Sequence, residues 1–336
     1  MEKRSKMEGV KFFNNTDLKK LTSSREGEQK FGEKISLISS EDQLRQSKVK
    51  YVLLGIPEDI GVRANYGKKG TSEAWTSFLK SFLNIQVNRY NDPSRIGILG
   101  PINCDLEMAQ AGNIDEADPN YYQKLGDLVH KIDEKVSLTI DKIVSAEKIP
   151  VIIGGGHNNA YGNIKGTSTA LNSALNVLNI DAHTDLRKLE HRHSGNGFNY
   201  ALKENFLNKY AVFGLHKNYT PEYIFREMDN SECIQFIMAE DLFKKPTGIM
   251  SGFEKTLDWL GNENLGLEID CDAMAYFPSS AKSPSGFSVE DVRKMIRTVA
   301  KLDNCKYLHL CEAAPSKENE GLVGKALSYF VSDFIA

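Results

Sequence analysis

Apolar and polar positions along this chain predict strands and helices that alternate from about residue 50 to the C-terminus. Short apolar runs bounded by Gly, Pro, Asn or Asp indicate strands, and longer segments with an apolar residue every three or four positions indicate helices. The predicted strands are 51–56, 95–99, 150–154, 175–180, 210–214, 234–238, 265–269 and 307–311. The predicted helices are 72–83, 120–147, 161–171, 221–228, 252–260, 289–302 and 320–335.

This alternation predicts an α/β fold. Strands that are apolar almost throughout are typical of a parallel sheet covered by helices on both faces. We therefore expect a single three-layer α/β/α domain, residues 49–336, around a mostly parallel central sheet of about eight strands. Residues 1–48 are polar and weakly periodic, and we expect them to form an N-terminal extension, partly helical and partly disordered. In a sheet of this kind, ligands bind outside the carboxyl ends of the strands.

Composition excludes several classes of function. The chain has 336 residues, of which 40% are hydrophobic and 26% are charged, as in ordinary soluble domains. A net charge of −3 argues against a nucleic-acid partner. No apolar run approaches the roughly 18 residues of a membrane span, and the N-terminal segment lacks the apolar stretch of a secretory signal. The five cysteines are scattered, without a Cys-x-x-Cys pair, so we expect reduced thiols and a cytoplasmic location.

Acidic and histidine side chains follow two of the predicted strands directly. They are Asp181, His183 and Asp185 after the fourth strand, and Asp270 and Asp272 after the seventh. Alternate residues of an extended chain share a face, so each group is expected to project together. A single aspartate in such a place would commonly cap a helix. The whole set indicates a pair of divalent cations, because unpaired carboxylates are costly to bury.

The third predicted strand ends in three glycines followed by His157. Glycine permits the positive φ angles of a tight turn and a close approach of other groups. The candidate set then contains four aspartates and two histidines, a mixture that suits Mn²⁺ or Fe²⁺ better than a thiolate zinc site would. Two such ions about 3.5–4 Å apart lower the pKa of a shared water and orient it for attack.

These fragments resemble the ureohydrolase family, which includes arginases, agmatinases and formimidoylglutamases. The resemblance extends from about residue 51 to the C-terminus, and the fragments occur in the family's order. They are Gly55-Ile56-Pro57-Glu58-Asp59 with Gly61, Asn65-Tyr66-Gly67, Gly154 to His157, Asp181 to Asp185, Ser194-Gly195-Asn196, Asp270-Cys271-Asp272, and Glu312 with Pro315. The resemblance implies an arginase-like fold and a metal-dependent hydrolase that cleaves a C–N bond of a linear amidine or guanidine with two Mn²⁺ per subunit.

The resemblance also implies the role of each residue. One ion would be held by His157, Asp181, Asp185 and Asp270, and the other by Asp181, His183, Asp270 and Asp272. Asp181 and Asp270 would bridge the two ions. Glu312 would be catalytic by accepting hydrogen bonds from the planar cation of the substrate, since charge-assisted bonds to such N–H groups are strong. Asp185 would also hand a proton to the departing nitrogen.

The substrate is expected to be a small molecule derived from an amino acid. Where arginase carries a proton-shuttle histidine, two residues after Asn196, this chain has Phe198. Phenylalanine cannot relay protons, which argues against plain arginase activity. His191 and His193 are expected to be solvated loop residues rather than replacement shuttles. The triple glycine before the histidine, the Asn-x-Gly fragment and Asp185-Leu-Arg187 are more similar to formimidoylglutamases, whereas Lys68-Lys69 replaces the arginine usual there.

Arg187 occupies a position that contacts the α-carboxylate of the substrate in arginase. A guanidinium matches a carboxylate with two parallel hydrogen bonds, and Ser194 and Asn196 would add neutral ones. This favours N-formimidoyl-L-glutamate, hydrolysed to L-glutamate and formamide in histidine metabolism, over agmatine, which has no carboxylate. The alternative for Arg187 is a structural partner such as Glu190.

Two other functions stay open on the sequence. The chain could be an arginase or a guanidino-acid hydrolase, or, in another class, a catalytically silent relative that binds metal for regulation. Family members often form trimers or hexamers, so a homo-oligomer is expected by resemblance. No membrane partner is expected.

Overall fold

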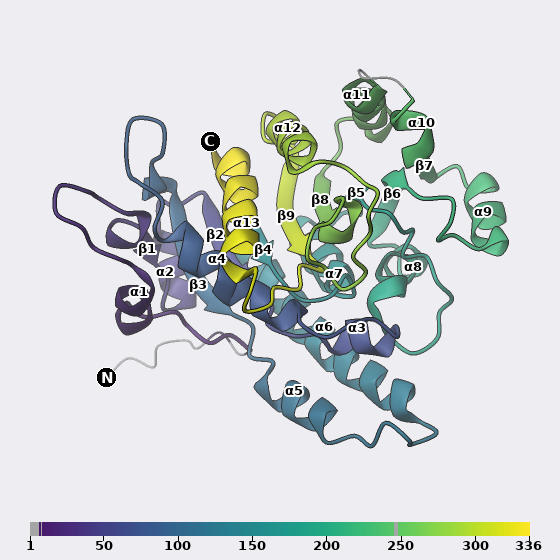
Figure 1. The fold of residues 1–336 in the computed structure, drawn as a ribbon, viewed down its shortest axis with the longest axis horizontal. Coiled ribbons are helices and arrows are strands. Elements are labelled where there is room, and N and C mark those ends of the chain that lie inside the picture. The colour runs from purple at the N-terminus through teal and green to yellow at the C-terminus, as the bar shows by residue number, and fades with distance from the viewer. Residues whose placement is uncertain (1–6, 8, 245–247) are drawn as a thin grey trace.

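Nine parallel strands form the centre of the molecule in the computed structural model, which describes residues 7, 9–244 and 248–336. The order of the strands in the described sheet is β1-β3-β2-β4-β9-β8-β5-β6-β7, and every pair of neighbours is parallel (Figure 1). The strands are β1 (Ser36–Leu37), β2 (Tyr51–Gly55), β3 (Ile96–Pro101), β4 (Ile149–Ile153), β5 (Leu175–Ile180), β6 (Leu207–Leu215), β7 (Ile234–Met238), β8 (Leu265–Asp270) and β9 (Cys305–Cys311).

The predicted α/β fold is confirmed. All eight predicted strands are present as β2 to β9, with ends that differ by at most three residues. The ninth strand, β1, comes from the N-terminal segment and pairs with β3 at the edge of the sheet, Ser36 opposite Gly97. A strand of two residues is too short to give a recognisable pattern of apolar residues.

The seven predicted helices are present, together with shorter ones. The described helices are α1 (Asn15–Leu21), α2 (Glu41–Gln46), α3 (Ile60–Ala64), α4 (Ala74–Phe82), α5 (Asp105–Gly112), α6 (Tyr121–Ser145), α7 (Asn159–Leu171), α8 (Gly197–Lys203), α9 (Glu222–Asp229), α10 (Ala239–Leu242), α11 (Gly248–Leu260), α12 (Val289–Val299) and α13 (Glu320–Ile335). The six that the pattern did not predict have at most eight residues, about two turns, so their apolar period is hardly repeated. Among the described residues, no helix combines the length and apolar character needed to cross a bilayer.

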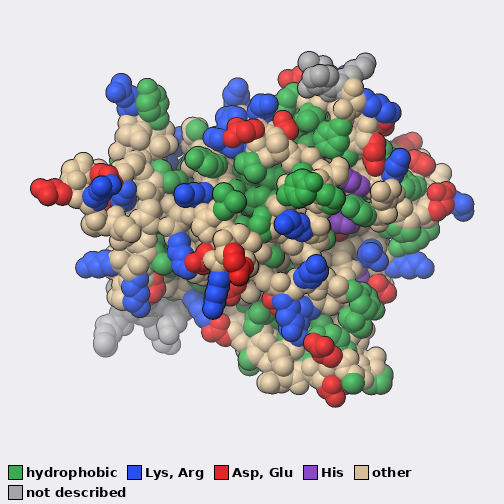
Figure 2. Space-filling view, viewed as in Figure 1, with side chains coloured by type: hydrophobic (Ala, Val, Ile, Leu, Met, Phe, Trp, Pro, Cys, Tyr) green, Lys and Arg blue, Asp and Glu red, His purple; other side chains and the backbone are tan. Residues whose placement is uncertain are grey.

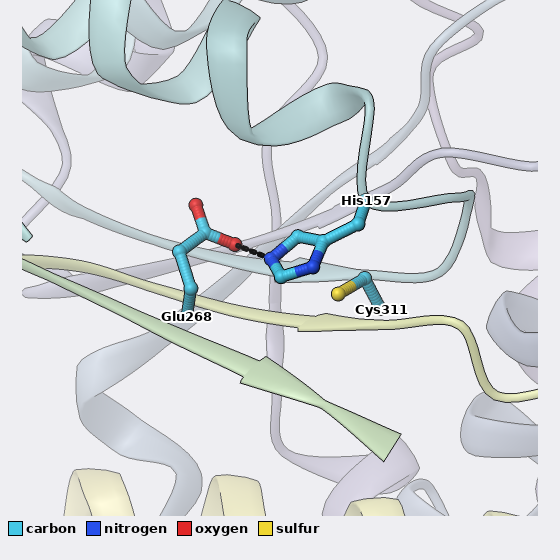
Figure 3. A group of neighbouring side chains, drawn as sticks. All are labelled: His157, Glu268 and Cys311. Carbon is cyan, nitrogen blue, oxygen red and sulfur yellow. Dashed lines mark ion pairs between the residues drawn. The ribbon is translucent and has the colours of Figure 1, made fainter. Parts of the chain in front are cut away.

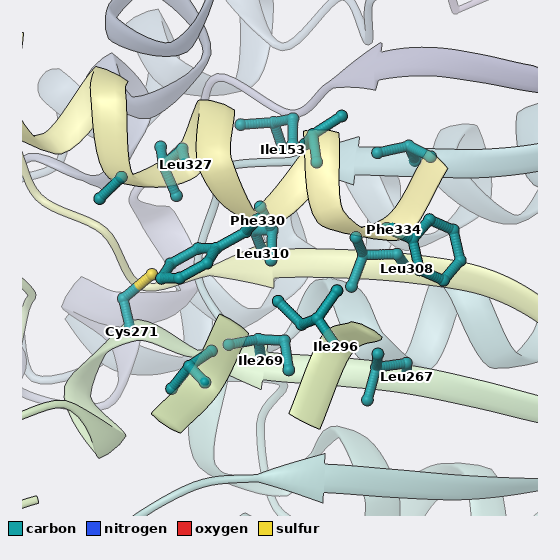
Figure 4. Packing of buried hydrophobic residues seen from close by; sticks show 14 of the residues in the cluster. Ile153, Leu267, Ile269, Cys271, Ile296, Leu308, Leu310, Leu327, Phe330 and Phe334 are labelled. Carbon is teal, nitrogen blue, oxygen red and sulfur yellow. The ribbon is translucent and has the colours of Figure 1, made fainter. Parts of the chain in front are cut away.

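Helices cover both faces of the sheet because the strand residues alternate between two apolar clusters. On β2, Tyr51 and Leu53 belong to the cluster that α4, α11, α12 and α13 cover, and Val52 and Leu54 belong to the one under α6, α7, α8 and α9. Figure 4 shows the first cluster, where Phe330 and Phe334 of α13 lie against β9 and β8. This gives three layers, α/β/α.

The described part of the N-terminal segment packs against the same two clusters. Phe13, Phe31 and Ile35 contribute to the first cluster, and Ile38 and Leu44 contribute to the second. Residues 9–48 are therefore joined to the sheet and its core. Residues 1–6 and 8 of the expected extension lie outside the described residues.

The order of the strands gathers the candidate site residues. The chain passes from β5 outward to β6 and β7 and then returns to place β8 and β9 between β5 and β4. Four neighbouring central strands, β4, β9, β8 and β5, thus end at one edge of the sheet. His157, Glu312, Asp270 and Asp181 follow or end these strands.

Candidate metal centre

Three of the predicted carboxylate ligands meet around one ring nitrogen of His157. Its Nδ1 lies 2.9 Å from Asp185 Oδ2, 3.1 Å from Asp270 Oδ2 and 3.2 Å from Asp181 Oδ2. One donor atom from each of these four residues lies within 4.8 Å of the others. The strand ends therefore form a group of three carboxylates and one imidazole that could hold a cation.

A second group adjoins the first through Asp181. His183 Nδ1 lies 3.2 Å from Asp272 Oδ2 and 3.5 Å from Asp181 Oδ1. Asp181 thus directs Oδ2 towards the first group and Oδ1 towards the second, the arrangement expected of a bridging carboxylate. Asp270 lies with the first group and not with Asp181, His183 and Asp272, so a bridging role for it stays a prediction.

Tight turns, rather than extended strands, bring these side chains together. Asp181 follows the end of β5, and its Oδ1 accepts a hydrogen bond from the N–H of His183, 2.7 Å away. Asp270, the last residue of β8, accepts one from the N–H of Asp272 at 2.8 Å. Asp185 has a φ of +49°, in the left-handed region. The expectation of alternate residues along a strand does not hold here, because aspartate side chains favour turns that bend the backbone.

The electrostatics of the group fit bound cations. Burial and the charges of Asp272 and Asp181 raise the pKa of Asp270 well above its usual value. Burial and the charge of Asp181 likewise raise the pKa of Asp185. Both ring nitrogens of His157 and Oδ1 of Asp272 are buried without a hydrogen-bond partner among the described residues. Cations would relieve the repulsion and satisfy Nδ1 and the carboxylate oxygens.

Glu312 joins this edge of the sheet at the end of β9. Its Oε1 accepts a hydrogen bond from the N–H of His157, 2.7 Å away, and its Oε2 accepts one from the hydroxyl of Ser280. Burial raises the pKa of Glu312 to about 8, against the lowering effect of these donors. A cationic ligand beside Glu312 would favour its ionised form, in which each oxygen keeps a second lone pair and can accept a hydrogen bond from that ligand.

A cleft of about 310 Å³ opens onto the cluster. Its lining includes His183, Asp185, Asp270, Asp272 and Glu312, and also exposed side chains that include Tyr66, Lys68 and Arg187. Basic and acidic side chains are intermixed on the face in Figure 2, without the continuous basic surface typical of nucleic-acid binding. The lining of the cleft therefore combines carboxylates and the imidazole of His183 with cationic side chains.

The structure places Arg187 in this cleft without an ion-pair partner among the described residues. Glu190, its suggested partner, lies 3.2 Å from Nε2 of His193 instead. A Cβ atom at Gly195 would lie 2.9 Å from Cδ of Arg187, so the glycine gives the side chain room to pass. Ser194 also lines the cleft and is within 3.1 Å of Nδ2 of Asn65, which donates to its hydroxyl.

Asn196 is buried outside the cleft lining and holds its own loop together. Its Oδ1 accepts hydrogen bonds from Arg192 and from the N–H of His193, and its Nδ2 donates to the carbonyl of His191 at 2.9 Å. Arg192 is fixed in turn by Asp133 of α6, with 2.9 Å between Nε and Oδ2. In this structure Asn196 therefore holds its own loop together, and the substrate contact expected of it stays a prediction.

Comparison with known proteins assigns the chain to a family. The model of the arginase family matches residues 49–334. The chain belongs to the arginase family. It is 26% identical over 300 residues to a formimidoylglutamase of Macrococcus caseolyticus, covering 88% of each chain, and 27% identical over 296 residues to one of Geobacillus thermodenitrificans, covering 86% of this chain and 84% of that one. The resemblance seen in the sequence is confirmed.

Solved structures show the same fold. A formimidoylglutamase from Bacillus subtilis superimposes with a TM-score of 0.75 at 15% identity, covering 93% of this chain and 92% of that chain. A formiminoglutamase of Trypanosoma cruzi, determined with Mn²⁺, superimposes with a TM-score of 0.71 at 17% identity, covering 91% and 97%. Membership of the arginase family also confirms the prediction of a hydrolase that acts on C–N bonds.

Phe198 of this arginase-family chain lies under the candidate centre, outside the cleft lining. It is fully buried, stacks on Tyr210 with 4.3 Å between ring centroids, and meets His157 edge-on at 5.0 Å. Its ring supports a candidate ligand instead of relaying protons. His193 is buried rather than solvated, contrary to expectation, and neither it nor His191 lines the cleft.

Sequence reasoning missed two residues beside the centre. Glu268 on β8 and His309 on β9 are fully buried, and 2.6 Å separates Oε2 of Glu268 from Nδ1 of His309. The sequence contained a signal for Glu268, because a carboxylate inside an otherwise apolar buried strand is unusual. Glu268 also lies two residues before Asp270, so strand alternation puts both on one face.

Proposed function

We propose that the chain hydrolyses N-formimidoyl-L-glutamate to L-glutamate and formamide at a dinuclear manganese centre. The observation that carries the proposal is a single cleft in which a carboxylate–imidazole cluster and Glu312 are joined to two cationic side chains, Lys68 and Arg187. An amidine with two carboxylates offers a planar cation for Glu312 and two anionic groups for the cationic side chains. The names of the formimidoylglutamase relatives support the same substrate.

We infer two Mn²⁺ per chain. The first would be held by His157, Asp181, Asp185 and Asp270, and the second by Asp181, His183, Asp270 and Asp272. Bound divalent cations supply a water molecule of lowered pKa. Their positive charge also stabilises the negative charge that develops on the atoms bonded to the amidine carbon. The oxygen-rich set with two imidazoles suits manganese.

Glu312 would bind the planar amidinium. Its two oxygens are fixed by the N–H of His157 and the hydroxyl of Ser280, so the carboxylate is oriented before substrate arrives. Holding the amidine at a set angle brings its carbon to the attacking water and reduces the entropy lost in reaction. Charge-assisted hydrogen bonds to both N–H groups would also keep the amidine protonated and electrophilic.

Asp185 would complete the hydrolysis by moving a proton. Water adds its oxygen to the amidine carbon, and its proton passes to the nitrogen that carries the glutamyl group. The bond between this nitrogen and the carbon then breaks, which releases glutamate as the amine and formamide as the other product. Asp185 lines the cleft, so its carboxylate would take a proton from the attacking water and pass it to the departing nitrogen.

The cationic side chains that line the cleft would select the substrate. The Arg187 guanidinium can bind one carboxylate of N-formimidoyl-L-glutamate with two hydrogen bonds, and the Lys68 ammonium can bind the other as a point charge. Ser194 would add a neutral hydrogen bond. Agmatine offers no carboxylate, and arginine offers one carboxylate beside an ammonium group, so both match two cations less well.

A product assay tests the proposal. Manganese-loaded protein is incubated with N-formimidoyl-L-glutamate, arginine, agmatine or 4-guanidinobutyrate, and formamide and urea are measured. Formamide from the first substrate at the highest kcat/KM is expected. Urea from arginine or guanidinobutyrate would instead assign a guanidine substrate. Two bound metals with no turnover of any substrate would indicate a regulatory relative. The trimeric or hexameric assembly stays a prediction, which light scattering would test.

A further inference from the structure

A buried glutamate and histidine lie behind the proposed ligand His157 and have no part in the chemistry above. Figure 3 shows Glu268 on β8 pointing towards the ring of His157, on the side away from the chain's turn into α7. Glu268 and His309 are direct cross-strand partners in the pairing of β8 with β9. Both are fully buried. A carboxylate in such a place is costly unless it has a specific partner.

One carboxylate oxygen faces both imidazoles. Oε2 of Glu268 lies 2.6 Å from Nδ1 of His309 and 3.6 Å from Nε2 of His157. The other ring nitrogen of His309 lies 3.2 Å from the carbonyl oxygen of Gly154. A carbonyl oxygen only accepts, so His309 donates from Nε2 to Gly154, and its Nδ1 shares a hydrogen bond with Oε2 of Glu268. This fixes the position of Oε2 behind His157.

The opposite nitrogen of His157 faces the candidate metal centre. Nδ1 lies within 3.2 Å of three aspartate oxygens, and Nε2 faces Glu268. A neutral imidazole carries hydrogen on one nitrogen only, and a metal needs the lone pair of the other. The charge of a carboxylate 3.6 Å behind Nε2 favours the hydrogen on that nitrogen, which leaves the lone pair of Nδ1 for a metal ion.

We infer that Glu268, held by His309, is a positioning residue that makes His157 a metal ligand. The inference rests on the proposed ligation by His157 and adds residues that no comparison assigns. Cys311, the third member of the group in Figure 3, is not needed for it.

The test measures the two manganese affinities separately. Mn²⁺ is titrated calorimetrically into metal-free wild-type protein, Glu268→Gln and His309→Gln. His157 belongs to only one of the two groups of ligands. We expect each variant to weaken one binding step about 10- to 100-fold and to leave the other close to wild type. Excess Mn²⁺ should then restore turnover of Glu268→Gln.

Asp133→Asn is the matched control. It also neutralises a buried carboxylate in an ion pair, with Arg192, but its carboxylate contacts no candidate ligand side chain. It should leave both manganese affinities unchanged. Thermal unfolding of the metal-free variants identifies any variant that does not fold. If Glu268→Gln does not fold, the manganese affinities of His309→Gln test the inference.

Each outcome separates this inference from the proposed function. If wild-type protein binds fewer than two Mn²⁺, or if His157→Gln leaves both affinities intact, the proposed ligand set fails and the inference fails with it. If those results hold but Glu268→Gln and His309→Gln bind like wild type, only the inference is overturned. Equal weakening of both steps would also overturn it, because it would indicate general structural damage.

Discussion

Glu312 accepts a hydrogen bond from the main-chain N–H of His157, with 2.7 Å between Oε1 and the nitrogen. The bond connects the end of β9 to the turn after β4. A carboxylate proposed to bind the substrate is thereby held at a set distance from a proposed metal ligand. Because both positions depend on the same turn, the proposed substrate site and the proposed metal site would be built as one unit.

Glu312→Gln should remove the charge of this carboxylate and keep its hydrogen bond to the main chain. The amide oxygen can still accept from the N–H of His157, so manganese content should remain that of wild type. Loss of the charge-assisted bonds to the amidinium should lower kcat/KM by about 10- to 150-fold, equivalent to about 1.5–3 kcal/mol. Elemental analysis and steady-state kinetics measure the two effects. Loss of metal from the variant would instead make Glu312 a scaffold residue or a ligand.

Asp181→Ala should disturb both metal positions, because Asp181 directs one oxygen into each group of ligands. Bound manganese should fall well below two per chain and turnover should be lost. Asp272→Ala is the control, since it removes a ligand from the second group and should leave one ion in place. The number of metals per chain after dialysis measures both. Two tightly bound ions in Asp181→Ala would contradict the bridging role.

Arg187→Ala should raise KM strongly for N-formimidoyl-L-glutamate without changing manganese content. The test combines this change with a substrate analogue that lacks the α-carboxylate. If the guanidinium binds that group, the two losses are coupled by at least about 1 kcal/mol in a double-mutant cycle. Lys188→Ala removes a neighbouring exposed cation that does not line the cleft, so its KM should match wild type. Additive losses would show that Arg187 does not bind the carboxylate.

His193 should make stability fall in acid. Burial, with the nearby cations, lowers the pKa of His193 from 6.5 to about 3 in the folded state, and its Nδ1 accepts a hydrogen bond from the N–H of Gly195. Below pH 6.5 the unfolded chain binds a proton that the folded chain does not. The stability is therefore complete above pH 6.5 and is lost as the pH falls towards 3. Between pH 7 and pH 5 the loss is about 2 kcal/mol.

Urea unfolding at pH 7 and pH 5 measures this loss. His193→Asn, whose Oδ1 can replace Nδ1 as acceptor, should lose about 2 kcal/mol less than wild type over this range. His130→Gln changes an exposed histidine on α6 and should keep the wild-type difference. Equal losses in all three proteins would show that His193 is protonated in the folded state as readily as in the unfolded one.

Local patterns in the sequence determined much of the fold. The apolar runs of β2 to β9 and the apolar period of α6 and α13 arise from burial of one or both faces, so the strands and longer helices could be predicted from spacing alone. The position of the aspartates directly after β5 and at the end of β8 also predicted the site. In a parallel sheet the carboxyl ends of all strands lie at one edge, so these groups had to share it.

Only the tertiary structure decided which of these side chains meet. The pairing order that places β9 and β8 between β4 and β5 depends on the packing of whole elements, which no local spacing records. The same packing fixes the cross-strand pair of Glu268 and His309, the burial of His193 and the place of Asn196 outside the cleft. Periodicity reports how a residue is oriented within its own element. Contact with a distant element depends on how the chain folds back, and that is a property of the whole structure.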